Sequence, residues 1–295
     1  MTAMTFAATA HNHASTDNAF NPDTQRIKSH LFFLADDLLE GRDTGSRGHE
    51  IAALYIATEF AKYGLKPAGT DGYMQNVAFR KANLVQESPK FTFTQNGETV
   101  DFDYPKEYLA SPSLLSTEAN VKGEMVFVGY GIVADELSHN DYKDLDVKGK
   151  VVVALAGKPS DFPSEEGAHF ASGYQKQKYA VDNGAIGMIT ITTPKNEKVR
   201  PYQSRLNYIH TPRMAWLDDS GQPANSFSQL KGGAYMSEGA ARKLFEGAEK
   251  SLDDVYAQLE ADKVPQGFAL NGVVDISKTS VHDTITSPNV VGVLE

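Results

Sequence analysis

The two ends of this chain constrain its fold more strongly than any segment between them. The first part, up to Gly64, carries the apolar spacing of two helices, whereas the chain closes on SPNVVGVLE, which has the character of an apolar strand. A lone strand exposes unpaired N–H and C=O groups along both edges, and such edges promote aggregation. We therefore expect the last strand to belong to a larger sheet whose other strands follow Glu295.

Two helices are predicted near the start of the chain. The first begins at Asn21-Pro22-Asp23, carries one apolar stripe and ends at Gly41. The second is capped by Ser46, has Glu50 in its first turn, where the helix dipole favours a negative charge, and stops at Gly64. The apolar stripe of the first helix is formed by Ile27, Leu31, Leu34 and Leu38, and the residues expected to face inward in the second are Ala52, Tyr55, Ile56, Phe60 and Tyr63.

After GLKPAG the pattern changes from helical to strand-like, and we place a domain boundary between residues 69 and 70. Asn96-Gly97 stands between two apolar pairs, Phe91 with Phe93 and Val100 with Phe102, and is a strong signal for a two-residue hairpin. Further strands are expected over residues 125–128, 151–155, 185–191, 214–217, 271–276, 281–285 and 289–294, and helices over residues 174–183 and from near Ser237 and Ser251. Ser287-Pro288 marks the return to the first domain.

Composition excludes several classes of function. The 295 residues, 41% hydrophobic and 22% charged, are enough for one large or two modest globular domains. A net charge of −10 without any run of Lys or Arg argues against a nucleic-acid partner. The absence of cysteine excludes a disulfide framework, a thiolate nucleophile and a Cys-type zinc site. No apolar run approaches the roughly 18–20 residues that cross a bilayer, so no membrane span is expected.

The first twenty residues allow two interpretations. Ala8-Thr9-Ala10 suits the small-residue cleavage site of an export signal, but no Lys or Arg precedes Arg26. Either Met1 lies inside a longer signal whose basic start is absent, or residues 1–20 form a disordered polar tail. The first interpretation predicts an exported protein, periplasmic or extracellular.

Several segments together resemble zinc metallopeptidase family 28, the co-catalytic di-zinc exopeptidases that include many aminopeptidases. The opening ADDLLEGRDTGS resembles the start of their catalytic domain, and NVVGVLE resembles the strand just before their first metal-binding motif. GEMVFVGYGI, DYKDLDVKGKVVVALAG and KYAVDNGAIGMITI look like core segments of the protease-associated domain that some members carry between the first helices and an early strand. The resemblance covers residues 24–295.

This resemblance implies an α/β fold, in which an incomplete three-layer αβα zinc-exopeptidase domain carries an inserted, strand-rich α+β protease-associated domain. Residues 21–69 would be its N-terminal helices, residues 70–286 the insertion, and residues 287–295 the first part of the truncated catalytic domain. In the family, two zinc ions activate a bridging water, and their ligands begin with a His-x-Asp just beyond the NVVG strand. Because the last residue here is Glu295, we expect this portion to hold no catalytic residue, no metal ligand and no cofactor-binding residue, and to be inactive alone.

The complete enzyme is expected to bind two zinc ions and to hydrolyse peptide or protein substrates. An alternative of a different class stays open: a free-standing protease-associated module that binds peptides or a partner protein and has no catalysis. A reading frame that continues past Glu295 into a His-x-Asp motif would distinguish the two. No G-x-S-x-G sequence occurs, which removes the strongest sequence argument for a serine hydrolase.

Several local patterns imitate catalytic or metal-binding motifs. His139-Asn140-Asp141 has His-x-Asp spacing but lies in a polar stretch inside the expected insertion, and Glu165-Glu166 lies in PSEEGAHF, a turn-rich segment that we expect to be a solvated loop. His11 and His13 form a terminal His-x-His that would bind metal only adventitiously. We expect His282-Asp283 to be a hydrogen-bonded pair that serves the fold.

Two further patterns are weaker. Gly129-x-Gly131-x-x-Ala134 follows a strand, but no helical pattern follows it, so we exclude a dinucleotide site. In the loop 41–48, Arg42, Asp43 and Arg47 could reach toward the catalytic mouth of the complete enzyme, although helix capping and a surface ion pair explain them equally well. We do not assign these three residues to catalysis.

Overall fold

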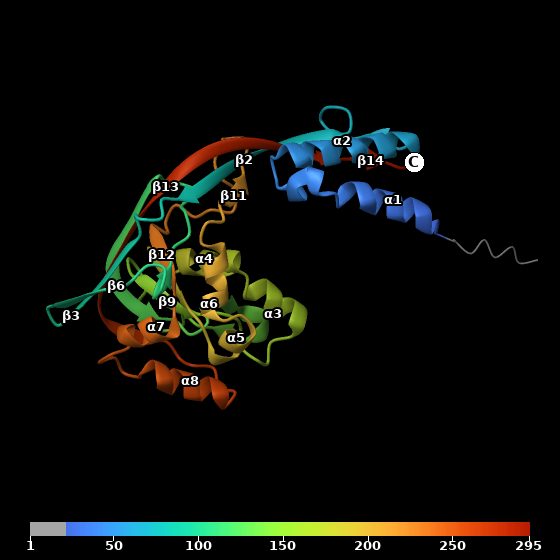
Figure 1. Cartoon of the computed structure of the whole chain (residues 1–295). Coiled ribbons are helices and arrows are strands. Elements are labelled where there is room, and N and C mark those ends of the chain that lie inside the picture. The colour runs from blue at the N-terminus through green and yellow to red at the C-terminus, as the bar shows by residue number, and fades with distance from the viewer. Residues whose placement is uncertain (1–21) are drawn as a thin grey trace, which may run out of the picture. The chain divides into compact units, whose positions relative to one another are not determined.

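The computed structural model describes residues 22–295, which form two compact units (Figure 1). Unit 1 comprises residues 22–75 and Pro288–Glu295, and unit 2 comprises Asn76–Ser287. The chain passes between the units within β2 (Met74–Leu84) and again within β13 (Phe268–Val290). The expected tail of residues 1–20, with His11 and His13, lies outside the described residues.

Unit 1 consists of α1 (Thr24–Leu34), the 3-10 helix η1 (Asp37–Arg42), α2 (Arg47–Lys62), and the short strands β1 (Lys66–Pro67) and β14 (Gly292–Val293), which pair antiparallel. The Asp23 carboxylate caps α1 by accepting from the backbone N–H groups of residues 25 and 26. The Ser46 hydroxyl caps α2 by accepting from the N–H of His49. Both helix starts therefore agree with the sequence prediction.

Unit 1 differs from the sequence prediction in the end of its first helix and in the exposure of two side chains. The first α-helix ends at Leu34 rather than Gly41, because Asp36 adopts an extended backbone (φ −68°, ψ 140°) that starts the separate helix η1. Leu38 is consequently 85% exposed on η1, and Tyr63, which we expected to face inward, is 45% exposed. Gly48 makes the close approach of α2 to η1 possible, since a Cβ at this position would overlap the backbone carbonyl of Leu39.

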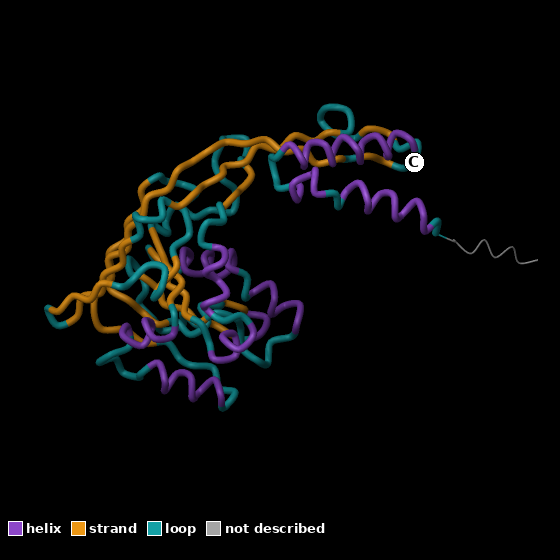
Figure 2. Tube along the Cα trace, viewed as in Figure 1, coloured by secondary structure: helices purple, strands orange, loops and turns teal. Residues whose placement is uncertain are grey.

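Unit 2 is built on a sheet, and strands are drawn in orange in Figure 2. The strand order is β11-β2-β13-β6-β9-β10-β12-β5, with β3 beside β13 and β4 beside β3. The strands β6, β9, β10 and β12 run parallel to one another, whereas β13, β5, β3 and β4 pair antiparallel. Their bounds are β3 (Lys90–Gln95), β4 (Glu98–Asp101), β5 (Tyr108–Leu109), β6 (Glu118–Phe127), β9 (Val151–Leu155), β10 (Gly187–Ile191), β11 (Arg213–Trp216) and β12 (Gly232–Met236). The separate pair β7 (Val133–Ala134) and β8 (His139–Asn140) lies outside this sheet.

Helices cover both faces of the parallel strands. The helical elements of unit 2 are η2 (Asp135–Leu137), α3 (Ser164–Phe170), α4 (Gly173–Asp182), α5 (Pro194–Val199), α6 (Tyr202–Arg205), η3 (Leu206–Tyr208), α7 (Glu238–Leu244) and α8 (Leu252–Glu260). In β9, Val151, Val153 and Leu155 pack in one core with α7 and α8. Val152 and Ala154 point to the opposite face and pack in a second core with α4. Burial on both faces explains why this strand reads as the continuous apolar run VVVAL.

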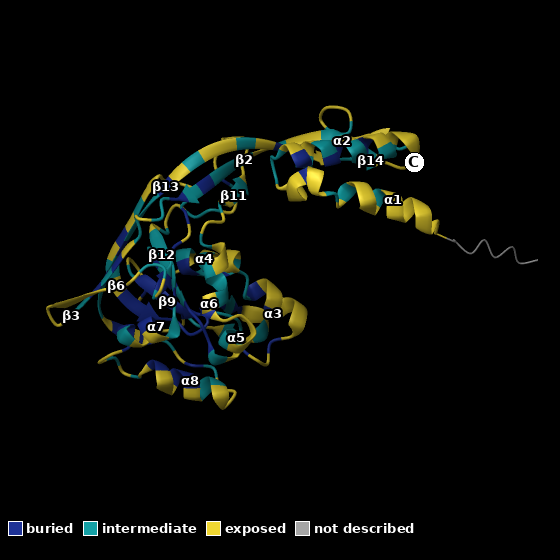
Figure 3. Cartoon of the chain, in the orientation of Figure 1, coloured by how far each residue is buried: buried dark blue, intermediate teal, exposed yellow. Residues whose placement is uncertain are grey.

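The hairpin at Asn96-Gly97 is confirmed: both residues have positive φ angles, and β3 pairs antiparallel with β4 across them. The strands expected over residues 271–276, 281–285 and 289–294 are instead one strand, β13, followed by β14. The mixed α/β class is confirmed by the parallel strands and their helices. Figure 3 shows the buried residues of unit 2 along β6 and β9, and the exposed surface of α1.

Candidate functional site

His139 and Asp141 come together in the structure. The imidazole Nε2 lies 3.0 Å from the Asp141 Oδ1, although it has no aligned hydrogen bond. The other carboxylate oxygen accepts from the N–H of Ile132, at 3.0 Å. The imidazole ring also packs edge-on against Phe162, with ring centroids 5.1 Å apart. The pair thus connects β8 to Ile132 and Phe162 inside unit 2. Among the described residues, no third metal ligand lies beside it.

Glu165 and Glu166 do not lie in a loop, as we expected, but in the first turn of α3. There the partial positive charge of the helix start favours acidic side chains, which accounts for them without a metal. His282 does not pair with Asp283, because neighbouring residues of β13 point to opposite faces. Its Nε2 lies 2.8 Å from the carbonyl of Ser113 instead, so this histidine ties β13 to the segment before β6.

The sequence 129–134 forms a turn and the short strand β7, and only the three-residue 3-10 helix η2 follows it, so the glycines do not lead into an α-helix. In the loop 41–48, the Asp43 carboxylate accepts from the N–H of Thr44 at 3.0 Å. Neither Arg42 nor Arg47 makes an ion pair among residues 22–295, so a surface ion pair does not explain them. Arg42 has a φ of 56°, which is uncommon for a side chain of this size.

The described residues contain no group of three or more His, Asp or Glu side chains that could hold a metal ion. The two zinc ions that the family resemblance implies therefore stay a prediction. Among the helices in residues 22–295, none has the length and apolar character needed to cross a membrane.

Lys176 on α4 is a buried cation that sequence reasoning did not identify. Only 4% of the residue is exposed, and its ammonium donates to the carbonyls of Leu155 (2.8 Å) and Gly157 (2.7 Å) at the carboxyl end of β9. The ammonium also lies 5.7 Å from the centre of the Tyr130 ring. Burial lowers the pKa of Lys176 to about 8. This lysine donates hydrogen bonds to backbone carbonyls at the end of β9, so its role is structural.

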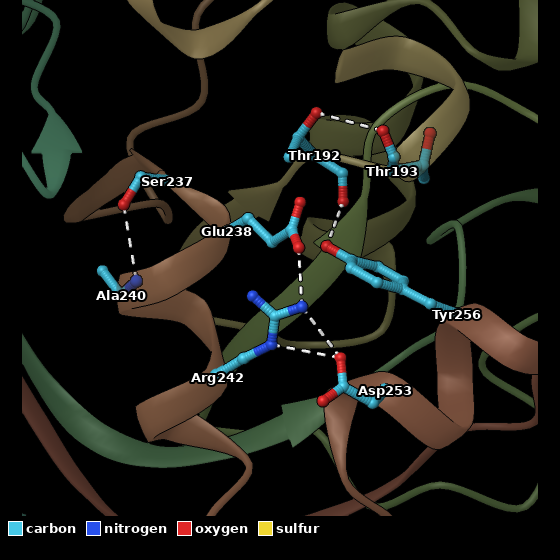
Figure 4. Close-up of polar contacts among 8 residues, drawn as sticks. All are labelled: Thr192, Thr193, Ser237, Glu238, Ala240, Arg242, Asp253 and Tyr256. Carbon is cyan, nitrogen blue, oxygen red and sulfur yellow. Dashed lines mark hydrogen bonds and ion pairs between the residues drawn. The ribbon is translucent and has the colours of Figure 1, made fainter. Parts of the chain in front are cut away.

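Arg242 links α7 to α8 through a cluster of polar contacts (Figure 4). The guanidinium donates to Glu238 at 2.6 Å and to Asp253 at 2.9 Å. Beside it, the Tyr256 hydroxyl donates to the carbonyl of Thr192, at 2.9 Å. Each group in this cluster has a hydrogen-bond partner within the fold, so the cluster does not have the features of a reactive site.

Unit 1 contains a largely apolar cavity of about 550 Å³. Arg42 and His49 are the only charged or titratable residues among those that line it. The His49 Nε2 lies 3.0 Å from the carbonyl of Pro288 and so links α2 to the last segment of the chain. The apolar lining comes from α1, α2 and residues 288–290: Leu31, Leu34, Ala35, Ala52, Ala53, Ile56, Pro288 and Val290.

The chain matches no protein-family model and no curated protein. Solved structures with some likeness include BSAP, a zinc aminopeptidase from Bacillus subtilis, with 15% identity and a TM-score of 0.33 over 90% of this chain and 46% of that chain. A second is the subtilisin-like protease Apa1 from the Antarctic psychrotroph Pseudoalteromonas sp. AS-11, with 10% identity and a TM-score of 0.28 over 70% of this chain and 36% of that chain. The chain spans less than half the length of either structure.

Proposed function

We propose that the chain is the N-terminal portion of an exported di-zinc metallo-exopeptidase of the aminopeptidase type. In this proposal unit 2 is the inserted protease-associated domain, and unit 1 is the first part of the catalytic domain. The zinc ligands and the general base lie beyond Glu295, so residues 1–295 are inactive alone. The resemblance of ADDLLEGRDTGS and NVVGVLE to the family supports the proposal from the sequence.

The uncovered apolar surface of unit 1 is the structural observation that carries the proposal. Leu31 is 61% exposed, Phe32 is 80% exposed and Leu38 is 85% exposed, and α1 has no buried residue at all. Exposed apolar groups gathered on one small unit are typical of a surface that packs against further protein. The apolar cavity of unit 1 adds to this surface. Both features favour a domain in which more strands and helices cover α1 and η1.

The first test compares two proteins: residues 1–295, and the product of the same reading frame extended past Glu295. Zinc is measured by elemental analysis after dialysis, and turnover is measured on an aminoacyl chromogenic substrate with added zinc. We expect about two zinc ions per chain and turnover for the extended protein, and neither for residues 1–295.

Two results would contradict the proposal. Stoichiometric zinc with turnover in residues 1–295 would place the active site in this portion and make His139, Asp141, Glu165 and Glu166 the first residues to mutate. An extended frame without a His-x-Asp motif, and without zinc, would favour a module that binds peptides or a partner protein.

A further inference from the structure

A second cavity, of about 260 Å³, lies in unit 2 and is lined by three cationic side chains. Arg213 comes from β11, Lys278 from β13, and Lys231 directly precedes β12. We call it the cation cavity. Among the described residues that line it there is no Asp or Glu. This wall contrasts with the chain as a whole, whose net charge is −10.

These cations have no counter-charge within the described part of the chain. Other lysines of the same sheet and its helices pair with carboxylates, as Lys243 does with Glu107 at 2.8 Å and Lys122 with Asp275 at 3.4 Å. Arg213 and Lys278 form no ion pair among residues 22–295. Lys278 is half-buried, whereas Arg213 is exposed.

Without a counter-charge, the pKa values of Lys278 and Arg213 are both lowered. Burial lowers the pKa of Lys278 to about 8, and the positive charge of Arg213 acts in the same direction. Desolvation also lowers the pKa of Arg213, since protein atoms surround its guanidinium even though part of the side chain reaches solvent. Two cations that repel each other in a partly desolvated space are stabilised when an anion enters between them.

The rest of the wall indicates what kind of anion fits. The apolar side chains are Leu109, Leu114, Leu115, Met188, Phe227 and Leu230. Gln177 and Thr190 add polar groups, and the Tyr235 hydroxyl is buried without a hydrogen-bond partner among the described residues. A buried hydroxyl of this kind gains by donating to a ligand. Cations beside an apolar wall favour an anion that carries an apolar body over an inorganic ion.

We propose that the cation cavity binds the α-carboxylate of an apolar amino acid, either free or at the C-terminus of a peptide, between Arg213 and Lys278. The guanidinium offers a planar pair of donors that matches a carboxylate, and the lysine adds a second positive charge. The apolar side chain of the ligand then packs on the leucines and Phe227. This proposal rests on unit 2 alone and holds whether or not the chain belongs to a peptidase.

Calorimetric titration of residues 1–295 at pH 7 tests it. The probes are L-leucine, the peptide Ala-Ala-Leu, and the C-terminal amide of each, at concentrations up to roughly 20 mM, which fill a site of millimolar affinity. We expect at least one acid to bind and its amide to bind about tenfold more weakly or not at all. Which of the two acids binds distinguishes the free residue from the peptide end.

Two outcomes of this titration overturn the proposal: neither acid binds, or the amides bind as tightly as the acids. Inorganic phosphate is a third probe in the same range. Phosphate affinity equal to that of the better acid overturns the assignment of an apolar carboxylate, because phosphate makes no use of the apolar wall.

Two variants link the binding to the cavity. We expect Lys278→Met and Arg213→Gln each to weaken the better acid about tenfold. Lys278→Met removes a partly desolvated charge and keeps an unbranched apolar side chain that is one atom shorter, and Arg213 is exposed, so both variants are expected to fold, as thermal melting checks. The matched control is Lys81→Met, since Lys81 lies on β2 beside Met214 and does not line the cavity. Unchanged affinity in both cavity variants, or an equal loss in the control, overturns the assignment.

Discussion

The helices of unit 1 and the strands of unit 2 carry similar apolar side chains but bury them very differently. In unit 2, β9 is buried along its whole length, and the cores on its two faces include α7, α8 and α4. In unit 1, the buried residues of α2 are three alanines and one glycine, whereas Phe32 and Leu38 lie mostly in solvent. The comparison indicates that unit 2 has its own hydrophobic core, while unit 1 leaves much of its apolar surface exposed.

The largest expected effect comes from replacing one phenylalanine in each unit. Phe127 is fully buried and packs against Phe245 and Phe268, with ring centroids 5.3 and 5.2 Å away. Phe127→Ala should lower the free energy of unfolding by about 3–5 kcal/mol. Phe32→Ser should change it by less than about 0.5 kcal/mol, because the ring is 80% exposed.

Urea unfolding measures both variants with two signals. The single tryptophan of the chain, Trp216, lies on β11, so its fluorescence reports on unit 2, while far-UV circular dichroism reports on the helices of both units. If Phe32→Ser destabilises the chain as much as Phe127→Ala does, unit 1 has a core that the structure does not show, and the comparison fails.

Two glycine substitutions sharpen the comparison, since we expect them to change the free energy of unfolding in opposite directions. Gly48→Ala should cost about 1–3 kcal/mol, because the new Cβ overlaps the Leu39 carbonyl and forces η1 away from α2. Gly173→Ala, at the first position of α4, meets no atom within 4 Å and should gain up to about 1 kcal/mol from helix propensity. Thermal melting followed by circular dichroism tests the pair. A neutral Gly48→Ala would mean that α2 and η1 separate easily and that their contact contributes little to unit 1.

Features of the fold could be predicted from the sequence where residues close together in the chain determine them, and were missed where the backbone or distant residues do. The hairpin at Asn96-Gly97 is local, since two adjacent residues with positive φ decide it, and it was predicted correctly. The end of α1 depends on the extended backbone of Asp36, which apolar spacing does not reveal, so the helix was predicted too long. Ser287-Pro288 resembled a break, yet β13 continues through it; a proline is compatible with a strand wherever its missing N–H is not needed for pairing.

The candidate sites follow the same rule. His139 and Asp141 are two residues apart, so their spacing alone identified a pair that the structure brings to 3.0 Å. Arg213 and Lys278 are 65 positions apart and join one cavity only because β2 lies between β11 and β13 in the sheet. The lack of an ion-pair partner for either cation is a property of the folded chain, so the sequence carried no signal for this cavity.

A smaller effect concerns the buried charge of Lys176, at the carboxyl end of β9 in unit 2. Because the pKa of Lys176 is about 8 in the folded chain and about 10.4 when unfolded, the unfolded state binds more protons between these values. Stability therefore rises with pH in this window. Relative to Lys176→Met, the free energy of unfolding of the unmodified chain should increase by about 1–2 kcal/mol from pH 8 to 9.5.

The control for this titration is Lys178→Met on the same helix. Lys178 is exposed and hydrogen-bonded to Asp182, which raises its pKa, so its titration falls above the window and the difference from the unmodified chain should stay flat. Urea unfolding at pH 8.0, 8.5, 9.0 and 9.5 is the measurement. A flat difference for Lys176→Met as well would show that its ammonium is solvated, and that unit 2 is less tightly closed around α4 than the structure indicates.

The smallest effect tests whether the surface of unit 2 contributes to its stability. Arg242 joins Glu238 and Asp253 on exposed faces of α7 and α8, and Lys62 pairs with Glu59 at 3.3 Å on α2 of unit 1. Exposed ion pairs contribute little, so Arg242→Gln and Lys62→Gln should each cost less than about 1 kcal/mol, and less still in 0.5 M salt.

Tyr256→Phe is the internal comparison. Removing its buried hydroxyl leaves the Thr192 carbonyl unpaired, which costs about 1–2 kcal/mol without salt dependence. If Arg242→Gln proves costlier than Tyr256→Phe, α7 and α8 are held by charge rather than by their apolar contacts, and the stability of unit 2 does not come from its core alone.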